Sequence, residues 1–404
     1  MKTRRTLFAL LFFLIYLTNL YGQRGPAWKG RIEIKEGVKA IINPMEPLYG
    51  ELELELVEDM SIGTDKDVNC LLYKIRDVDI DTDGFIYVLD SGNNRIQVFD
   101  NTGKYFRTIG KEGQGPGELN APVRLQIDDE TGHIFVTDRS RRILIFDKEG
   151  KYIDQDIHLS DYLLDFHLDS NGCIWGKFRL LVPTTHFIKK VSPTGKAVKT
   201  LAEMPYPINR AILSHSTTGN TAYMGAIVFS HGYESDLYLS KVDNHTFVYG
   251  YSNEYKLFEV NEAGEILLII RKRETPREIT KDEREQVIHQ IRQDIRRRGR
   301  IVSEISIDFP KYTPHYYSIV TDNRGRIYVR KNPPSRDLNV SHEYDVFNKE
   351  GIYLYKIRLS SYPDVIKEGH VYTWVAAEDT GEEQIKRYKI RNWEHIKDGI
   401  YPMP

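Results

Sequence analysis

The chain has 404 residues, 40% of them hydrophobic and 11% aromatic, and its formal net charge is −2. A charge this close to zero argues against general nucleic-acid binding, which uses a strongly basic surface. A chain of this length ordinarily divides into several domains, unless one repeating architecture accounts for it.

The first residues have the pattern of a secretory signal peptide. Lys2, Arg4 and Arg5 form a positive start, residues 7–17 are an apolar run, and Gly22 follows as a small residue. Because this run is too short for a comfortable membrane span, we expect cleavage near Gly22. Removing residues 1–22 takes the formal net charge to −5. We expect an exported, periplasmic or extracellular monomer without a membrane span; an uncleaved anchor is the alternative.

Residues 51–56 alternate glutamate with leucine. This is the period of a strand with one buried and one solvent-exposed face. The segment precedes every repeat in the chain and has no hairpin partner of its own. We therefore expect residues 51–57 to pair with a strand near residues 384–391.

Two kinds of turn recur along the rest of the chain. In the first, an apolar strand end leads into a polar stretch and a glycine that supplies positive φ, at residues 99–105, 146–152, 191–196, 260–265 and 347–352. In the second, a glycine precedes an apolar strand, at residues 83–88, 131–136, 171–175, 324–329 and 368–372, with a degenerate copy at 243–248. The second kind opens each repeating unit and the first kind closes it.

The spacing of these turns predicts an all-β fold, a six-bladed β-propeller. Gly84 and Gly132 are 48 residues apart, and Gly132 and Gly172 are 40 apart, which is the period of a four-stranded blade. Six opening turns and five closing turns leave the last unit with three strands, so its fourth strand must come from the N-terminal segment. Closing the ring in this way removes two exposed sheet edges. A linear β-solenoid is the alternative, but it would not need a three-stranded last unit.

The two cysteines of an exported chain could form a disulfide. Cys70 precedes blade 1, whereas Cys173 begins the second strand of blade 3. These positions lie on blades that are not neighbours, so we expect free thiols more than a bond.

We expect the propeller to span residues 23–404. Two of its segments are longer than a connection between blades requires. Residues 203–234 are rich in Gly, Ser and Thr and predict a long loop. Residues 275–314, between blades 4 and 5, predict a helix at about residues 280–298. Thr280 and Glu283 form a capping box at its start, and an apolar stripe follows at Val287, Ile288, Ile291 and Ile295.

Connections between consecutive blades cross the face of a propeller that carries the channel mouth. Both long segments therefore belong to that face, and we expect the helix to lay its apolar stripe on it. Long loops on rigid scaffolds frequently carry binding sites. The alternative is that they only cap the ring.

The candidate ligand-binding residues lie near the mouth end of the innermost strands. Counting back eight residues from the opening glycines selects Arg76, Arg124 and Tyr317. A looser alignment adds Asp236 and His315, and the hairpin between the second and third strands of blade 2 adds Arg142. The set is Arg76, Arg124, Asp236, His315, Tyr317 and Arg142. Its arginines favour an anionic ligand by their local field. The alternative is that Arg76 and Arg124 make routine ion pairs with nearby carboxylates such as Asp77 and Asp138.

Residues 90–100, Gly103-Lys104 and residues 113–119 resemble an NHL repeat. Blade 2 matches this pattern in Asp138, Arg142, Ile143, Phe146 and Asp147, and the later blades keep only the turns and strands. The whole chain resembles the exported six-bladed β-propeller proteins of Bacteroidetes and related bacteria. The resemblance implies a binding propeller. We expect a non-catalytic protein that binds a glycan, a peptide or a protein partner on its channel-mouth face.

Some similar propellers are enzymes, among them lactonases, phosphotriesterases and the lyase of peptide amidation, which hold a metal in the central channel. A calcium site needs several converging oxygen ligands, and a zinc site needs His, Cys or carboxylate groups. His167, His215, His231 and His315 are scattered, and strand-end residues such as Asp79, Asp165 and Asp236 are more often turn partners. We therefore expect no catalytic residue, metal or cofactor. A channel-centred metal-dependent hydrolase or lyase remains the alternative function.

Overall fold

The computed structural model describes residues 26–63, 67–182, 184–207, 209–217, 220–229, 232–297, 302–307, 309–331, 341–360, 362–376 and 382–399. The signal peptide expected at residues 1–22 lies outside these ranges. Among the described residues, no helix is both long enough and apolar enough to cross a membrane.

Six sheets, in which the four strands of each blade are antiparallel, form a six-bladed propeller, which confirms the predicted fold class. Blade 1 contains β5 (Ile75–Ile80), β6 (Ile86–Asp90), β7 (Arg95–Phe99) and β8 (Tyr105–Ile109), with the short 3₁₀ helix η1 (Ser91–Asn93) after β6. Blade 2 contains β9 (Arg124–Ile127), β10 (Ile134–Thr137), β11 (Arg142–Phe146) and β12 (Tyr152–His158). Blade 3 contains β13 (Tyr162–Leu168), β14 (Ile174–Leu181), β15 (Thr184–Val191) and β16 (Ala197–Pro205).

The other three blades share this order and take in strands from the start of the chain. Blade 4 contains β19 (Leu237–Lys241), β20 (Thr246–Tyr251), β21 (Lys256–Asn261) and β22 (Ile266–Lys272), extended by β2 (Val38–Asn43) and β1 (Arg31–Lys35). Blade 5 contains β24 (Ser318–Thr321), β25 (Ile327–Arg330), β26 (His342–Phe347), β27 (Tyr353–Leu359) and β3 (Glu51–Glu53). Blade 6 contains β28 (Val365–Lys367), β29 (His370–Ala376), β30 (Glu383–Ile390) and β4 (Leu56–Ile62), and the 3₁₀ helix η2 (Trp393–His395) follows β30.

An aspartate fixes the opening turn of three blades. Asp81 Oδ1 accepts a bond from the backbone N–H of Phe85 at 2.8 Å, and its Oδ2 accepts one from the hydroxyl of Tyr87 at 3.2 Å. Asp322 holds its own turn and Tyr328 in the same way, with the hydroxyl 2.8 Å from Oδ2. In blade 3 the equivalent residue, Asp169, accepts a bond from the indole N–H of Trp175 at 3.0 Å. The closing turns place glycine at positive φ, as at Gly103 (+87°), which confirms that reading of the sequence.

The N-terminal segment closes the ring, as predicted, but in a different register. β4 pairs antiparallel with β30, with Leu56 opposite Ile390. Residues 51–53 pair instead with β27 of blade 5, in parallel, so the expectation for them was wrong. The physical reason is Asn392, which binds Glu53 O at 2.8 Å and Glu55 N at 3.0 Å and holds the chain where it crosses from blade 5 to blade 6. With β2 on blade 4, this segment covers the outer edges of three consecutive blades.

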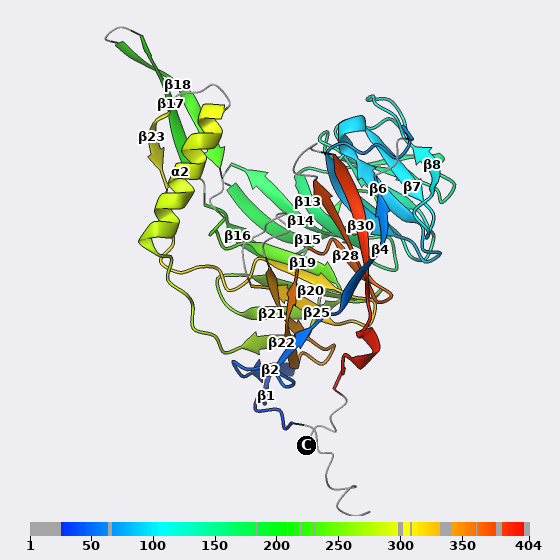
Figure 1. Ribbon diagram of the computed structural model, residues 1–404, viewed down its shortest axis with the longest axis vertical. Helices are drawn as coiled ribbons and strands as arrows, with labels where there is room; N and C mark the ends of the chain where they lie inside the picture. Colours follow the sequence, from blue (N-terminus) through cyan, green and yellow to red (C-terminus); the bar gives the residue numbers. More distant parts are fainter. Residues whose placement is uncertain are drawn as a thin grey trace, which may run out of the picture.

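The two long segments form a small module of their own. Residues expected to be a loop form the hairpin of β17 (Asn209–Thr217) and β18 (Asn220–Phe229), and β23 (Val302–Ser306) adds to β17. The predicted helix is present as α2 (Lys281–Arg297). Its capping box is formed, with the Thr280 N–H 2.9 Å from Glu283 Oε2. Figure 1 shows these four elements grouped at one side of the molecule, well away from β1 and β2.

The helix does not lay its stripe on the channel face as expected. It packs beside β23 of the module, and Ile295 is buried, whereas Val287, Ile288 and Ile291 are only half-buried. The strand that the helix contacts, β23, is itself paired with β17 of the unforeseen hairpin.

Hydrophobic side chains pack between neighbouring blades rather than around one centre. Leu89 of blade 1 packs with Leu125 of blade 2, and Ile385 of blade 6 packs with Val88 of blade 1. Cys70 is buried in the second of these clusters and Cys173 immediately precedes β14; the two cysteines are not bonded to each other, as predicted.

Candidate functional site

The innermost strands of all six blades surround a central channel with a cavity of ≈ 940 Å³. Along each inner strand every second side chain points to the same side, so the residues that face the channel alternate with residues that do not. Asp77 and Asp79 of β5, Arg124 and Gln126 of β9, and Asp165 and His167 of β13 line the cavity in this way. Tyr238, Tyr317 and Tyr362 add aromatic surface near the mouth.

Three of the six predicted residues lie in the wall of this cavity: Arg76, Arg124 and Tyr317. Arg124 is central to the mouth, since its Nε binds Leu164 O at 3.1 Å and lies 3.4 Å from Asp165 Oδ1. Its Nη1 lies 3.4 Å from Arg76 O. Arg124 therefore ties blade 2 to blades 1 and 3, and it pairs with Asp165 rather than with Asp138.

Asp236 lies just behind the wall. Its carboxylate binds Lys177 Nζ at 2.5 Å and His186 Nδ1 at 2.7 Å. Burial by itself would raise the pKa of Asp236, but Lys177 and His186 outweigh it and lower the pKa below its ordinary value. Asp236 thus acts on the channel through Lys177, which does line the cavity.

His315 and Arg142 lie away from the cavity. His315 belongs to a cluster between blades 4 and 5, where its Nδ1 is 3.7 Å from Glu274 and Lys331 Nζ is 2.6 Å from the same carboxylate. Arg142 is buried within blade 2 and pairs with Asp138 at 2.9 Å and Asp156 at 3.2 Å. Their geometry gives neither residue a contact with a channel ligand.

The mouth carries both signs of charge rather than the basic surface that the arginines suggested. Asp77, Asp165 and Asp364 line the same cavity as the arginines. Burial in the channel wall raises the pKa of Asp77 to about 7, although Arg124 and the Leu125 N–H favour its charged form. Asp77 therefore changes charge close to neutral pH.

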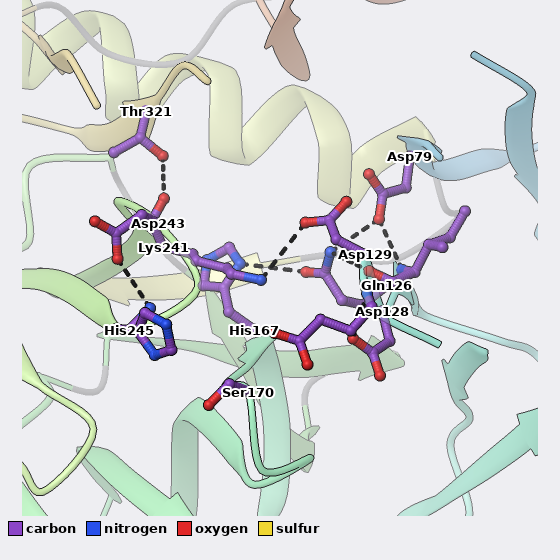
Figure 2. A network of polar contacts seen from close by, with 12 residues as sticks. Asp79, Gln126, Asp128, Asp129, His167, Ser170, Lys241, Asp243, His245 and Thr321 are labelled. Carbon is purple, nitrogen blue, oxygen red and sulfur yellow. Dashed lines mark hydrogen bonds and ion pairs between the residues drawn. The ribbon is translucent and has the colours of Figure 1, made fainter. Parts of the chain in front are cut away.

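Polar contacts join all six blades at the far end of the channel, which we call the channel floor. Asp79 of blade 1 accepts a bond from Gln126 Nε2 at 2.8 Å, and Gln126 Oε1 lies 3.2 Å from His167 Nδ1 of blade 3 (Figure 2). Burial raises the pKa of Asp79 to about 6 and lowers that of His167. In both groups of the floor, the Asp79 carboxyl and the His167 imidazole, burial shifts the pKa toward the neutral form.

Asp129 completes the floor from the loop after β9. It lies 3.6 Å from Lys241 of blade 4 and 3.4 Å from Lys367 of blade 6. Thr321 of blade 5 binds the backbone oxygen of Lys241 (Figure 2). These contacts brace the floor across the channel and join all six blades, whereas the contacts described above for the mouth join blades 1 to 4.

The described residues contain no group of three or more His, Cys, Asp or Glu side chains placed to hold a metal ion. Of the histidines weighed in the sequence, His231 lies outside the described residues. Sequence reasoning missed Lys177, Gln126 and Lys241 as channel residues. For Gln126 a signal existed, since it follows Arg124 by two positions on one strand; Lys177, from a second strand, had none.

A family model described as "Domain of unknown function (DUF4934)" matches residues 66–398 of this chain. A curated relative, Protein brain tumor of Drosophila melanogaster, is 34% identical over 70 residues. This match covers 17% of the present chain and only 7% of the fly protein.

The chain is also similar to solved structures. A protein from Bacteroides fragilis described as exported superposes with a TM-score of 0.51 and 11% identity, over 86% of this chain and 100% of that one. A DUF4221 family member from Bacteroides vulgatus gives a TM-score of 0.48 and 11% identity, over 83% and 98% of the two chains. A virginiamycin B lyase from Staphylococcus aureus gives 0.42 and 12%, over 83% and 99%. The family match covers the inner strands of all six blades, and the chain therefore belongs to the DUF4934 family.

Proposed function

We propose that this protein is an exported binding propeller that takes a polar ligand, a glycan or a peptide, into its central channel from the face that carries the module. The observation that carries the proposal is the cavity of ≈ 940 Å³ lined by all six blades. Ligand pockets typically have volumes of about 300–1,000 Å³. The cavity is thus large enough for several sugar or amino-acid units.

The chemistry of the wall favours this ligand class. Tyrosine rings present a flat apolar face with a polar tip, which suits sugar rings and peptide side chains alike. Arg124, Lys177 and Asp165 line the same cavity as Tyr238 and Tyr317. A lining that mixes charges with aromatic rings favours a polar ligand over a purely apolar one.

The braced floor supports access from the mouth. Asp129 joins the second, fourth and sixth blades there through its two lysine contacts. The module lies beside the mouth, because both of its segments connect the outer strand of one blade to the inner strand of the next.

Export is part of the same proposal and is supported by the signal-like residues 1–22. The alternative function is a channel-centred metal-dependent hydrolase or lyase. No specific observation on the described residues favours it.

A binding screen tests the proposal. Oligosaccharide and peptide panels are presented to the mature chain, and the hits are measured by calorimetry with Arg124→Ala and Tyr238→Ala. Truncating a central Arg or Tyr at a binding site costs about 2 kcal/mol or more, so we expect at least about 30-fold weaker binding. Tyr73→Ala, an exposed tyrosine outside the cavity, is the control and should bind normally. Equal affinity in all four proteins would reject the channel as the site.

A further inference from the structure

Blade 5 carries a row of polar side chains on the face that packs toward blade 6. Arg330 of β25 lies directly opposite Ser318 of β24 and Tyr344 of β26 in the two antiparallel registers. Directly opposed residues point to the same face of a sheet. Tyr344 packs with Ile366 of blade 6, which identifies the face. The three residues therefore lie in one line between the two blades.

This row is buried and its hydrogen-bonding groups are mostly unused. Arg330, Tyr344 and Ser318 are 2%, 0% and 7% exposed. Among the described residues, Arg330 Nε and Nη1, Ser318 Oγ and the neighbouring Tyr317 Oη have no hydrogen-bond partner, and Tyr344 Oη, which interacts with Arg330, has no further one. Arg330 keeps one hydrogen bond, from Nη2 to Tyr317 O at 3.1 Å. Its guanidinium also lies 4.7 Å from the centre of the Tyr362 ring.

Arg330 lacks the carboxylate counter-ion that the other buried arginines of the described chain have. Arg326 has Asp322 at 2.7 Å and Arg142 has Asp138 at 2.9 Å, whereas no described carboxylate forms an ion pair with Arg330. The acid on the adjoining segment, Asp364, instead accepts a bond from the Trp374 N–H at 3.0 Å. A buried charge without a counter-ion is costly, so proteins normally pair it.

The cluster adjoins the channel. Tyr317, Ser318 and Tyr362 line the cavity, and Arg330 lies immediately behind them. Burial raises the pKa of both Tyr317 and Tyr344, which keeps their hydroxyls protonated and able to donate. The half-buried ring of Tyr362 covers the guanidinium, so this side chain must turn for a ligand to reach it.

We propose that Arg330, Ser318, Tyr317 and Tyr344 form a subsite for an oxyanion, a carboxylate, sulfate or phosphate group carried by the channel ligand. Several donors and one positive charge converge there, and an oxyanion offers acceptor oxygens and the missing negative charge. The inference rests on the proposed function, because it names the chemical group that the channel ligand carries. It predicts acidic glycans, or peptides with a free or modified acidic group, as ligands.

Small anions test the subsite without knowledge of the full ligand. Sodium sulfate, phosphate and acetate are titrated separately into the full mature chain at constant ionic strength, balanced with sodium chloride, and binding is followed by calorimetry and thermal shift. We expect saturable binding of at least one anion, and the anion that binds most tightly identifies the group. Arg330→Gln should weaken it about 10- to 100-fold, and Tyr344→Phe about 2- to 10-fold.

Arg358→Gln is the matched control. Arg358 lies on β27 of the same blade, outside the cavity lining, and its side chain is 58% exposed beside Glu51 and Glu343. Its loss should leave anion binding unchanged. If Arg330→Gln does not fold, Tyr344→Phe decides, since it removes one hydroxyl group only.

Two results would overturn the subsite: saturable binding of none of the three anions, or binding that both Arg330→Gln and Tyr344→Phe retain at full strength. The larger proposal fails separately. If the anions bind as expected but no glycan or peptide is retained in the channel, the subsite stands and the proposed function falls. If a glycan or peptide binds in the channel with an affinity that Arg330→Gln leaves unchanged, the proposed function stands and the subsite falls.

Discussion

Single aspartates have three distinct tasks in this propeller. Asp81 and Asp322 shape opening turns and hold a tyrosine six positions later. Asp77 lies in the channel wall, where its Oδ2 accepts a bond from the Leu125 N–H of the next blade at 2.9 Å. Asp129 braces the floor. The residue type is the same, and the environment decides whether the carboxylate is a turn partner, a link between blades or a counter-ion.

The raised pKa of Asp77 gives a pH dependence with a definite sign. Burial lifts this pKa from 3.8 to about 7, so the folded state binds a proton over this window that the unfolded state has released. The free energy of unfolding contributed by Asp77 is therefore greatest below pH 4 and falls as the pH rises to about 7.

Asn cannot ionise. We therefore expect Asp77→Asn to abolish the part of the fall in unfolding free energy with rising pH that Asp77 causes. The stability of the wild type relative to the variant should fall by about 1–4 kcal/mol between pH 4 and pH 8. Urea unfolding at several pH values measures the difference. Asp83→Asn, at an exposed turn position, is the control and should show a constant offset. A pH-independent difference for Asp77→Asn would refute the assignment.

At the scale of elements, the N-terminal segment is the most consequential part of the chain outside the repeats. It supplies β2, β3 and β4 to the outer edges of blades 4, 5 and 6. Only β4 completes a blade of four strands; the other two cover edges that would otherwise expose unpaired backbone groups. The segment therefore links half of the ring along its circumference.

The closing strand should be critical to stability. Ile62 of β4 is 3% exposed and packs between blades 6 and 1. We expect Ile62→Ala to lower the free energy of unfolding by about 2–5 kcal/mol, because it leaves a cavity in a packed interface. Chemical denaturation measures the change.

Ile34→Ala on β1 is the matched control, since Ile34 is 77% exposed. Its effect should stay within about 0.5 kcal/mol. Equal effects of the two substitutions would contradict the role assigned to β4.

The capping box of α2 should control the module without controlling the propeller. Thr280→Ala removes a hydroxyl that lies 3.2 Å from the Glu283 N–H, and losing such a cap costs about 0.5–2 kcal/mol. We expect faster hydrogen exchange in the first turn of α2, with unchanged exchange in the blades. Thr280→Ser keeps the hydroxyl and should restore slow exchange. Unaltered exchange in Thr280→Ala would mean that the helix start depends on other contacts.

At the scale of the whole molecule, the sequence predicts the architecture well because turns are local. The glycines and the polar residues before them indicate each hairpin, and the spacing of these turns indicates the number of blades. The register of residues 51–53 was missed because it depends on Asn392, which lies more than 300 positions away in the chain. The hairpin of β17 and β18 was missed because its composition resembles that of a loop.

The candidate site was predictable only in part for the same reason. The position of Arg124 on an inner strand follows from counting along one blade. Its partner Asp165 belongs to another blade, and the partner of Asp236 comes from a second strand, β14. Such contacts depend on how blades pack around the channel. The unpaired state of Arg330 could not be inferred from its sequence position, since it reflects the absence of an ion pair among the described residues.

The central claim is that the channel holds the ligand. A crystal structure of the mature chain with the tightest ligand from the glycan and peptide screen tests it most directly. The account predicts density inside the cavity, in contact with Arg124 and Tyr317 and with an acidic group directed toward Arg330. Density confined to the module, or to the outer surface of a blade, would contradict it.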